Sequence, residues 1–256
     1  MRIATADQLS MVVTANRVGT GYTLRALRDL EALGLVGHGR HGRHGRHGRS
    51  KVWHLTTSGQ RAVAEGGDVP VRPHASTGER AIAAGLAAHG LGVTDVMIAF
   101  GGHLLDWEVE VDHSIDKVRR VVTDAVLRRD SYGAEVEFLE FDRGTMSVPR
   151  LAAKLRAYQT YGEATYHEGE RGTIGTTKYV WRERYRRSRS FPLIRLVLAG
   201  GVNATLERRT EALRQQARGI RLRVVAAPLT MLQQRPREEW QWQPIGVDDG
   251  TTPRAA

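Results

Sequence analysis

Apolar residues recur at helical spacing through the N-terminal part of the chain. Leu9, Val12 and Val13 share one side of a helix predicted over residues 5–15, and glycines at positions 19 and 21 interrupt it. A second helix is predicted over 22–33, ending at Gly34, with an inward-facing stripe of four leucines: Leu24, Leu27, Leu30 and Leu33. Short strands at 35–36 and 52–55 and a helix over 57–63 follow. The predicted order is therefore helix, turn, helix, hairpin and helix.

The tripeptide His-Gly-Arg is repeated four times between the two predicted strands, from His38 to Arg49. Such low-complexity sequence is typical of a flexible, exposed hairpin tip. A histidine-rich tract can also bind a metal ion. The repeat alone does not decide between these two interpretations.

From residue 79 onward, helical spacing gives way to alternating apolar and polar positions. Residues 66–78 are predicted to be a linker, and helices are predicted over 79–89 and 94–100. Three strands follow at 107–111, 121–127 and 135–142. A helix is predicted next over 147–161, and then a long loop or helical insertion over 163–190. The last predicted elements are a strand at 193–198, a helix over 205–216 and a strand at 222–226. Three consecutive strands favour a meander, and the later strand-helix-strand order requires a crossover. We therefore expect a fold of the α+β/α/β class, with a mixed β-sheet flanked by helices.

These elements predict two domains and a tail. The first domain covers residues 1–66 and the second covers 79–232. Residues 233–256 carry no periodic signal and are expected to be disordered. A chain of 256 residues is long enough for two modest domains.

The element order of the first domain is that of a winged helix-turn-helix, whose second helix enters the DNA major groove. That helix would expose Tyr22, Thr23, Arg25 and Arg28, and the hairpin would place five cations beside phosphates: Arg40, Arg43, Arg46, Arg49 and Lys51. Residues 20–61 contain eight Lys and Arg but only two acids, a local excess that suits phosphate binding. Protein contact or dimerisation is the alternative use of such a module. A complete module has a further helix before the turn, so we expect the chain to start short of it.

The chain as a whole is strongly basic. Its 38 Lys and Arg against 28 Asp and Glu give a formal charge of +10 and a pI near 10.4, which favours a polyanionic partner. A codon bias toward arginine is the alternative explanation. No apolar run approaches the roughly 18 residues that cross a bilayer, there is no signal-peptide core, and the absence of cysteine excludes disulfides. We therefore expect a cytoplasmic protein that binds double-stranded DNA and no membrane.

Acidic residues stand at strand positions where the pattern predicts buried side chains. Glu140 and Asp142 share one face of the third strand, and Asp124 interrupts the apolar second strand. Because a lone buried carboxylate is costly, convergence of the three predicts a site for Mg²⁺ or Mn²⁺. Lys154 lies on the apolar face of the next helix, from which it could stabilise a phosphoryl oxygen. We predict these four residues to be catalytic in metal-dependent phosphodiester hydrolysis, with the three acids as metal ligands.

A simpler interpretation of the same residues involves no metal. Acids near strand ends are common, and Glu140 or Asp142 could pair with Arg143 or Arg150. The Lys154 side chain could extend along the helix to reach solvent.

Two motifs of the second domain match a known family. They are Leu-Glu-Phe-Asp-Arg-Gly-Thr from Leu139 and Lys-Leu-Arg-Ala-Tyr from Lys154, with weaker matches at His89–Ala99, Leu105–Glu110 and Thr123–Leu127. The chain resembles the replication-relaxation protein family of bacterial plasmids and mobile elements over most of residues 1–230. The resemblance implies a DNA-binding winged helix joined to a restriction-endonuclease-like domain, with a role in plasmid replication, relaxation or mobilisation. It leaves open a homodimer and contacts with other replication or mobilisation proteins.

The resemblance also implies roles for individual residues. Asp124 would match the first acid of a restriction-endonuclease-like site and Glu140 the second. The usual lysine two residues later is absent, because Asp142 stands there, and Lys154 would substitute for it from the helix. This departure supports the alternative of a non-catalytic DNA-binding regulator of transcription or replication on a degenerate nuclease scaffold. A relaxase with Tyr158 or Tyr161 as nucleophile is a third interpretation, but its paired-histidine metal motif is missing.

A last cluster covers residues 181–189, where five arginines are interleaved with Trp181 and Tyr185. Such a segment could grip a phosphate backbone and stack bases on its aromatic rings. An exposed, solvated helix or loop is the alternative, and the sequence favours neither.

Overall fold

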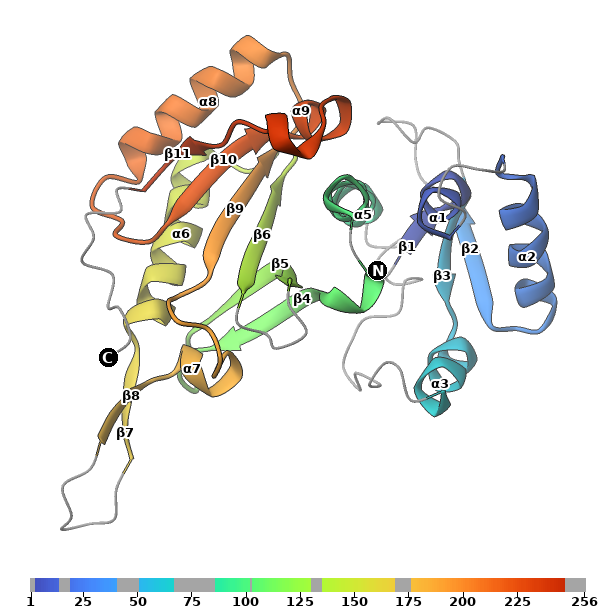
Figure 1. The fold of residues 1–256 in the computed structure, drawn as a ribbon, viewed down its shortest axis with the longest axis horizontal. Coiled ribbons are helices and arrows are strands. Elements are labelled where there is room, and N and C mark those ends of the chain that lie inside the picture. Colours follow the sequence, from blue (N-terminus) through green and yellow to red (C-terminus); the bar gives the residue numbers. More distant parts are fainter. Residues whose placement is uncertain are drawn as a thin grey trace. The chain divides into compact units, whose positions relative to one another are not determined.

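The computed structural model describes residues 3–13, 19–40, 51–66, 86–101, 103–129, 135–168 and 176–246. Its contacts divide the chain into two compact units, an N-terminal unit of Met1–Leu105 and a C-terminal unit of Asp106–Ala256. The two units are coloured blue to green and green to red in Figure 1.

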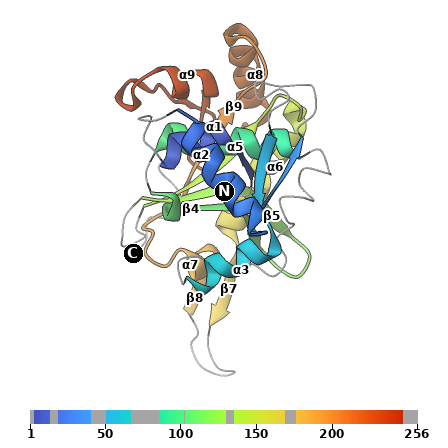
Figure 2. The same ribbon diagram turned by 90° about the vertical axis from the view of Figure 1, so that its right-hand side faces the viewer.

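The N-terminal unit is built on a three-stranded antiparallel sheet in the order β1-β3-β2. Its elements are β1 (Ile3–Thr5), α1 (Ala6–Val13), α2 (Gly21–Ala32), β2 (Val36–Arg40), β3 (Lys51–Leu55) and α3 (Thr57–Glu65). The predicted hairpin is present as β2 and β3, and α2 lies beside β2 (Figures 1 and 2). The His-Gly-Arg repeats beyond Arg40 lie outside the described residues.

Of the four leucines in the stripe of α2, Leu27 is buried and Leu24 is half-buried. Leu27 packs in a buried cluster with Val36 and Trp53. Leu30 is 38% exposed and Leu33 is 70% exposed, so the prediction that the whole stripe faces inward is wrong. Leu33 is the residue that caps α2, one position beyond the last helical residue, and so it no longer follows the helical face.

Helix α5 (Ala87–Phe100) packs in the N-terminal unit. Its Ala87 and Leu91 form a buried cluster with Ile3 and Val52 of the small sheet. The Gln8 amide of α1 donates to the Leu91 carbonyl at 2.9 Å and to the Asp95 carboxylate at 2.8 Å. The observed division therefore lies after α5, whereas the sequence placed this helix at the start of the second domain. The first part of the helix predicted over 79–89 lies outside the described residues.

The C-terminal unit contains a mixed six-stranded sheet in the order β11-β10-β9-β6-β5-β4. The strands β4 (Trp107–Ser114), β5 (Arg120–Arg128) and β6 (Val136–Asp142) form the predicted antiparallel meander. Strands β9 (Leu193–Leu198) and β10 (Val224–Pro228) continue the sheet in parallel with β6, and the short edge strand β11 (Gln243–Pro244) is antiparallel. The predicted mixed sheet is confirmed.

Two crossover helices cover one face of this sheet. α6 (Val148–Glu163) connects β6 to β9, and α8 (Asn203–Gln216) connects β9 to β10 (Figure 1). Leu151, Leu155 and Tyr158 of α6 pack in one buried cluster with Leu206 and Leu213 of α8 and the inward side chains of the strands. Within the part of the chain that is described, no helix combines the length and apolar character needed to cross a membrane.

Two segments have more regular structure than the sequence predicted. The polar stretch 163–190 contains the hairpin β7 (Thr165–Glu168) and β8 (Thr176–Tyr179), which extends away from the six-stranded sheet, and the short helix α7 (Trp181–Arg184) (Figures 1 and 2). Residues expected to lie in a disordered tail form the end of α9 (Leu229–Gln234), a 3₁₀ turn at Arg237–Glu239 and β11. Residues 247–256 lie outside the described residues.

Candidate functional site

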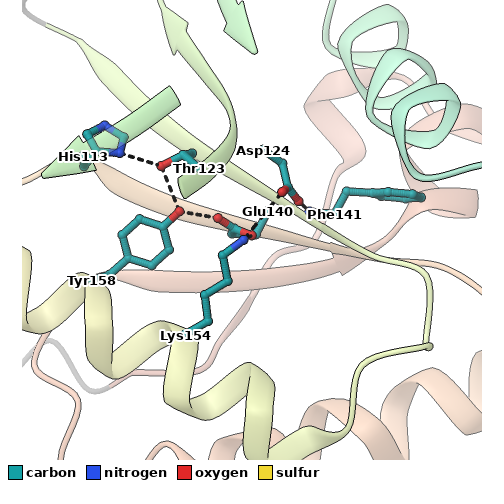
Figure 3. Close-up of polar contacts among 7 residues, drawn as sticks. All are labelled: His113, Thr123, Asp124, Glu140, Phe141, Lys154 and Tyr158. Atoms are coloured by element: carbon teal, nitrogen blue, oxygen red, sulfur yellow. Dashed lines mark hydrogen bonds and ion pairs between the residues drawn. The ribbon is translucent and has the colours of Figure 1, made fainter. Parts of the chain in front are cut away.

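Three of the predicted catalytic side chains meet between the sheet and α6 (Figure 3). The Lys154 ammonium group donates to Glu140 Oε2 and lies 3.5 Å from Asp124 Oδ1. Asp124 Oδ2 accepts a hydrogen bond of 2.8 Å from the backbone N–H of Phe141. Glu140 is 2% exposed, whereas the side chains of Asp124 and Lys154 keep 13% and 23% of their surface in solvent. The site is therefore reached from solvent through Lys154 and Asp124.

An irregularity in β4 and β5 helps to form this site. Neighbouring residues of a regular strand point to opposite faces, yet Thr123 and Asp124 both contact side chains of α6. Opposite them in β4, Glu110 has a positive φ of 48° and lies between Val109 and Val111, which pair with Ala125 and Thr123. The backbone of the two strands thus departs from regular pleating where Asp124 enters the site.

A chain of buried hydrogen bonds leads away from Glu140 toward β4. The Tyr158 hydroxyl contacts Glu140 Oε1 and lies 2.8 Å from Thr123 Oγ1. Thr123 Oγ1 lies 3.1 Å from His113 Nδ1, and His113 Nε2 lies 2.6 Å from the Tyr185 hydroxyl. Every member is at most 2% exposed. The Tyr158 hydroxyl is therefore enclosed and is not placed to act as the nucleophile of a relaxase.

Asp142 does not join the other two acids. Its Oδ2 accepts from Arg209 Nε of α8 at 2.7 Å, and its Oδ1 accepts from the Gly144 backbone at 3.0 Å. Arg209 also donates to the Met146 carbonyl, so the pair fixes the loop after β6. The prediction that three carboxylates converge is wrong for Asp142, because an arginine from α8 lies within reach of this strand end.

Burial and neighbouring charge shift the proton affinities of the buried groups. Burial, reinforced by the negative charge of Asp124, raises the pKa of Glu140 to about 8. Burial alone would lower the pKa of Lys154, but the carboxylates of Glu140 and Asp124 offset it, and the net shift is upward. Burial and the positive charge of Arg184 lower the pKa of His113 to about 4, against a hydrogen bond to the Val121 backbone. His113 is therefore neutral at neutral pH.

Asp124 and Glu140 form a donor set of two carboxylates. Within the described ranges, no group of three or more His, Asp or Glu side chains is arranged to hold a metal ion. Mg²⁺ is commonly bound by one or two carboxylates together with water and substrate phosphate. Asp124 Oδ1 and Glu140 Oε2 both face the Lys154 ammonium, so these oxygens already converge on a cation. Two carboxylates placed in this way could hold a Mg²⁺ or Mn²⁺ ion only if its remaining ligands came from water or a bound phosphate.

The N-terminal candidates for DNA contact are only partly exposed. Tyr22 is 63% exposed, and Arg25 and Arg28 are exposed on α2. Thr23 is 7% exposed, so its predicted place on the outward face is wrong, because it lies on the buried side of α2 with Leu27. Lys51 is exposed and lies 5.7 Å from the Trp53 ring. The side chain of Arg40, and Arg43, Arg46 and Arg49, lie outside the described residues.

The arginine-rich segment is partly built into the fold. Trp181 and Tyr185 are 3% and 1% exposed, so their rings are not available for base stacking. Arg184 pairs with Glu108 at 2.7 Å, and the Arg182 guanidinium lies 4.8 Å from the Trp181 ring. The hypothesis that these aromatic residues stack bases is therefore wrong.

Sequence reasoning missed His113, Thr123 and Arg209. His113 continues the alternation of β4 beyond the predicted strand end at 111, which places it on the inward face with Val111. Regular alternation would place Thr123 on the opposite face of the strand from Asp124, so the strand pattern gives no signal for it. Arg209 carries no local signal, because its partner Asp142 is distant in sequence.

The fold and site define a two-unit protein of helices and sheets with a buried carboxylate–lysine cluster on a mixed sheet. The replication-relaxation family matches residues 1–177, and the chain belongs to this family. The match includes Asp124, Glu140, Lys154 and Tyr158 and ends before β9. Comparison with curated proteins and with solved structures finds no match.

Proposed function

We propose that this protein acts in the replication or relaxation of plasmid or mobile-element DNA, and that its C-terminal unit nicks DNA in a divalent-metal-dependent reaction. The observation that carries the proposal is the meeting of Asp124, Glu140 and Lys154 at one partly exposed point. Two acids from adjoining strands and one ammonium group are the groups that restriction-endonuclease-like chemistry requires. The order of β4, β5, β6, β9 and β10 in the sheet also supports a restriction-endonuclease-like unit.

In this proposal each residue has a distinct part. Asp124 and Glu140 would hold a Mg²⁺ or Mn²⁺ ion, which when bound supplies an activated water and positive charge at the phosphate. Lys154, reaching from α6, takes the place of the lysine that is usual two residues after the second acid. Its flexible side chain can move from the carboxylates to a non-bridging phosphate oxygen and stabilise developing negative charge there.

A plasmid-nicking assay tests the proposal. Supercoiled DNA is incubated with the full chain, with Mn²⁺, Mg²⁺ or EDTA, and the conversion to open circles is measured. Asp124→Asn and Glu140→Gln should each reduce nicking by at least about 100-fold, because each removes a metal ligand. The matched control is Glu137→Gln, which alters a partly buried acid of the same strand that pairs with Arg195 at 2.8 Å instead. Nicking that survives Glu140→Gln, or is absent with every metal, contradicts the proposal.

We propose in addition that the N-terminal unit is a winged helix that binds double-stranded DNA. The succession α1, α2, β2, β3 and the exposed Arg25 and Arg28 on α2 support this assignment. The basic charge of the chain adds a general attraction to phosphates.

DNA binding is tested by fluorescence anisotropy with a labelled duplex over a range of salt concentrations. Arg25→Ala with Arg28→Ala should weaken binding and reduce the slope of log affinity against log salt by about 2, one for each lost phosphate contact. The control is Arg119→Ala with Arg120→Ala, which removes the same charge from the end of the β4–β5 loop and the start of β5, where both arginines pair with acids. Equal losses in the two double variants would contradict a specific role of α2.

A non-catalytic DNA-binding regulator is the second candidate. It is favoured by the hydrogen bonding of Glu140, whose Oε1 and Oε2 are both engaged by α6, and by the absence of Asp142 from the site. This candidate predicts duplex binding that is unchanged in Glu140→Gln and no nicking with any metal. The two assays above therefore distinguish the candidates.

A further inference from the structure

The hydroxyl groups in the chain from Tyr185 to Glu140 restrict how its hydrogen bonds can run. A hydroxyl group has one proton and can donate only once, while a neutral imidazole donates from one nitrogen and accepts at the other. A carboxylate that holds a metal ion is ionised and can only accept, so in that state Tyr158 must use its proton on Glu140 Oε1. Thr123 must then donate to the Tyr158 oxygen and accept from His113 Nδ1, which leaves His113 Nε2 to accept from the Tyr185 hydroxyl. With Glu140 ionised, the donors from Tyr185 to Glu140 therefore run in a single direction, and the Val121 backbone is a second acceptor for the His113 N–H.

We infer that Tyr158 is a positioning residue: the one-way hydrogen-bond chain Tyr185–His113–Thr123–Tyr158 holds Glu140 Oε1 and directs Oε2 to the position shared by Lys154 and Asp124. The inference rests on the proposed function, because it assigns the orientation of a proposed metal ligand. The separations along the chain support it: 2.6 Å, 3.1 Å and 2.8 Å lead from Tyr185 to Tyr158, and Tyr158 contacts Glu140 directly. The residues come from β4, β5, α6 and the end of α7, so the hydrogen-bond chain ties four elements to one carboxylate. Figure 3 shows the part of it from His113 to Glu140.

The surroundings of the hydrogen-bond chain indicate that it does more than satisfy buried polar groups. Its members are 0–2% exposed, so water cannot replace a lost partner. His113 is enclosed by the rings of Phe138, Tyr161 and Tyr185, with centroids 4.8–5.8 Å away, which fixes its ring plane. A buried partner that orients a metal-binding carboxylate is commonly worth about 10- to 100-fold in metal affinity. Tyr158 is therefore expected to influence metal binding without touching the ion.

The first test is the tautomer of His113, read by ¹⁵N NMR of the full-length protein without metal at pH 9. We expect the proton on Nδ1 in the wild-type protein. Tyr158→Phe removes the acceptor of Thr123, so the Thr123 hydroxyl can donate to Nδ1 and the population should shift toward Nε2–H. Tyr161→Phe is the matched control, since it removes a buried tyrosine hydroxyl from the same helix that takes no part in the chain. The His113 tautomer in Tyr161→Phe should equal that in the wild-type protein.

The second test is Mn²⁺ binding, measured from free Mn²⁺ by electron paramagnetic resonance with the ion alone. Tyr158→Phe should weaken binding by about 10- to 100-fold relative to Tyr161→Phe. Thr123→Val should weaken binding in the same direction, because it breaks the chain at its centre, and Thr123→Ser should restore the wild-type value. A conservative rescue of this kind is not expected if Thr123 only fills space.

The outcomes separate this inference from the proposed function. An Nε2–H tautomer in the wild type, or equal tautomers in Tyr158→Phe and Tyr161→Phe, overturns the directed chain even if the protein nicks DNA. Equal Mn²⁺ affinity in these two variants overturns the positioning role. A third outcome is that the His113 tautomer responds to Tyr158→Phe but the wild-type protein does not bind Mn²⁺. This outcome overturns the proposed metal site and, with it, the role assigned to Tyr158.

Discussion

Thr123 and Asp124 are consecutive residues of β5, yet both side chains contact α6: Thr123 Oγ1 lies 2.8 Å from the Tyr158 hydroxyl, and Asp124 Oδ1 lies 3.5 Å from the Lys154 ammonium. A regular strand would turn one of them to the other face of the sheet. The left-handed backbone of Glu110, opposite them in β4, marks where the pleat is interrupted. Irregular backbone of this kind is found where a sheet must present side chains to a functional site.

Replacing Glu110 tests the importance of this irregularity. A β-branched residue is strongly disfavoured at φ 48°, so Glu110→Val should lower the free energy of unfolding by about 1–3 kcal/mol, measured by urea denaturation. Asp112→Val is the control, because it makes a comparable change at an exposed position of the same strand that lacks a positive φ. Equal effects of the two substitutions would show that the Glu110 conformation is not required.

Removing the ammonium group from the site should destabilise the C-terminal unit. Lys154→Met leaves two acids without their cation, which we expect to cost about 3 kcal/mol in unfolding free energy. Measured at pH 9, above the pKa of about 8 that Glu140 has in the folded protein, adding Glu140→Gln should recover at least about 1 kcal/mol of this loss, because the buried negative charge is removed as well. Arg221→Met is the contrast: its pair with Glu163 is more than half exposed on both sides, and less than about 1 kcal/mol is expected. Additive effects of Lys154→Met and Glu140→Gln would contradict the coupling.

The raised pKa of Glu140 predicts a pH dependence of stability. The folded protein holds this proton up to about pH 8, whereas the unfolded chain releases it near 4.5, so the contribution of Glu140 to stability is full below 4.5 and is lost as the pH rises through 8. His113, whose folded pKa is lowered to about 4, acts oppositely, but its contribution is complete above its unfolded value of 6.5. Between pH 6.5 and 8 the Glu140 term should therefore dominate the difference between wild type and Glu140→Gln.

The measurement is urea unfolding in EDTA at several pH values in that window. The wild-type free energy should fall with pH by up to about 1.4 kcal/mol per unit more steeply than that of Glu140→Gln. Asp124, Lys154 and Tyr158 face Glu140 in both proteins, so their direct contributions largely cancel in the comparison. Parallel curves would mean that the Glu140 carboxyl titrates in the folded protein as it does in the unfolded chain.

The sequence predicted those parts of the fold that carry a long repeating pattern. The strands β4, β5 and β6 are seven to nine residues long and rich in valine and other apolar residues, and α6 repeats its apolar positions over 16 residues, so these elements were recognised. Strands β1 and β11 have three and two residues, and their stability comes from pairing with β3 and β10. Such short strands show no periodicity, because the partner strand determines them.

The parts of the site that follow from regular spacing within one element were also predictable, whereas the contacts between elements were not. Lys154 and Tyr158 are four residues apart on one helix, so their common face followed from helical geometry. Glu140 and Asp142 do share a face of β6, but their partners could not be foreseen, because Arg209 and Lys154 reach them from different helices. The entry of Asp124 beside Thr123 depends on a backbone distortion that regular alternation excludes.

The loops at the end of β6 and β9 offer a final prediction, because they pack backbone against backbone. Gly200 has φ 86°, and a Cβ atom there would lie 2.1 Å from the Arg143 carbonyl oxygen, next to the loop that Asp142 and Arg209 hold. Gly200→Ala should therefore lower the unfolding free energy by much more than about 1 kcal/mol, which is the loss expected from placing alanine at a positive φ without a clash. Gly219→Ala isolates that smaller effect, since Gly219 has φ 84° and nothing within 4 Å of its Cβ position. If urea midpoints of the two variants coincide at equal slope, the close approach of the two loops does not contribute to stability. A larger loss in Gly200→Ala would show that contact between these loops supports the strand end next to Glu140.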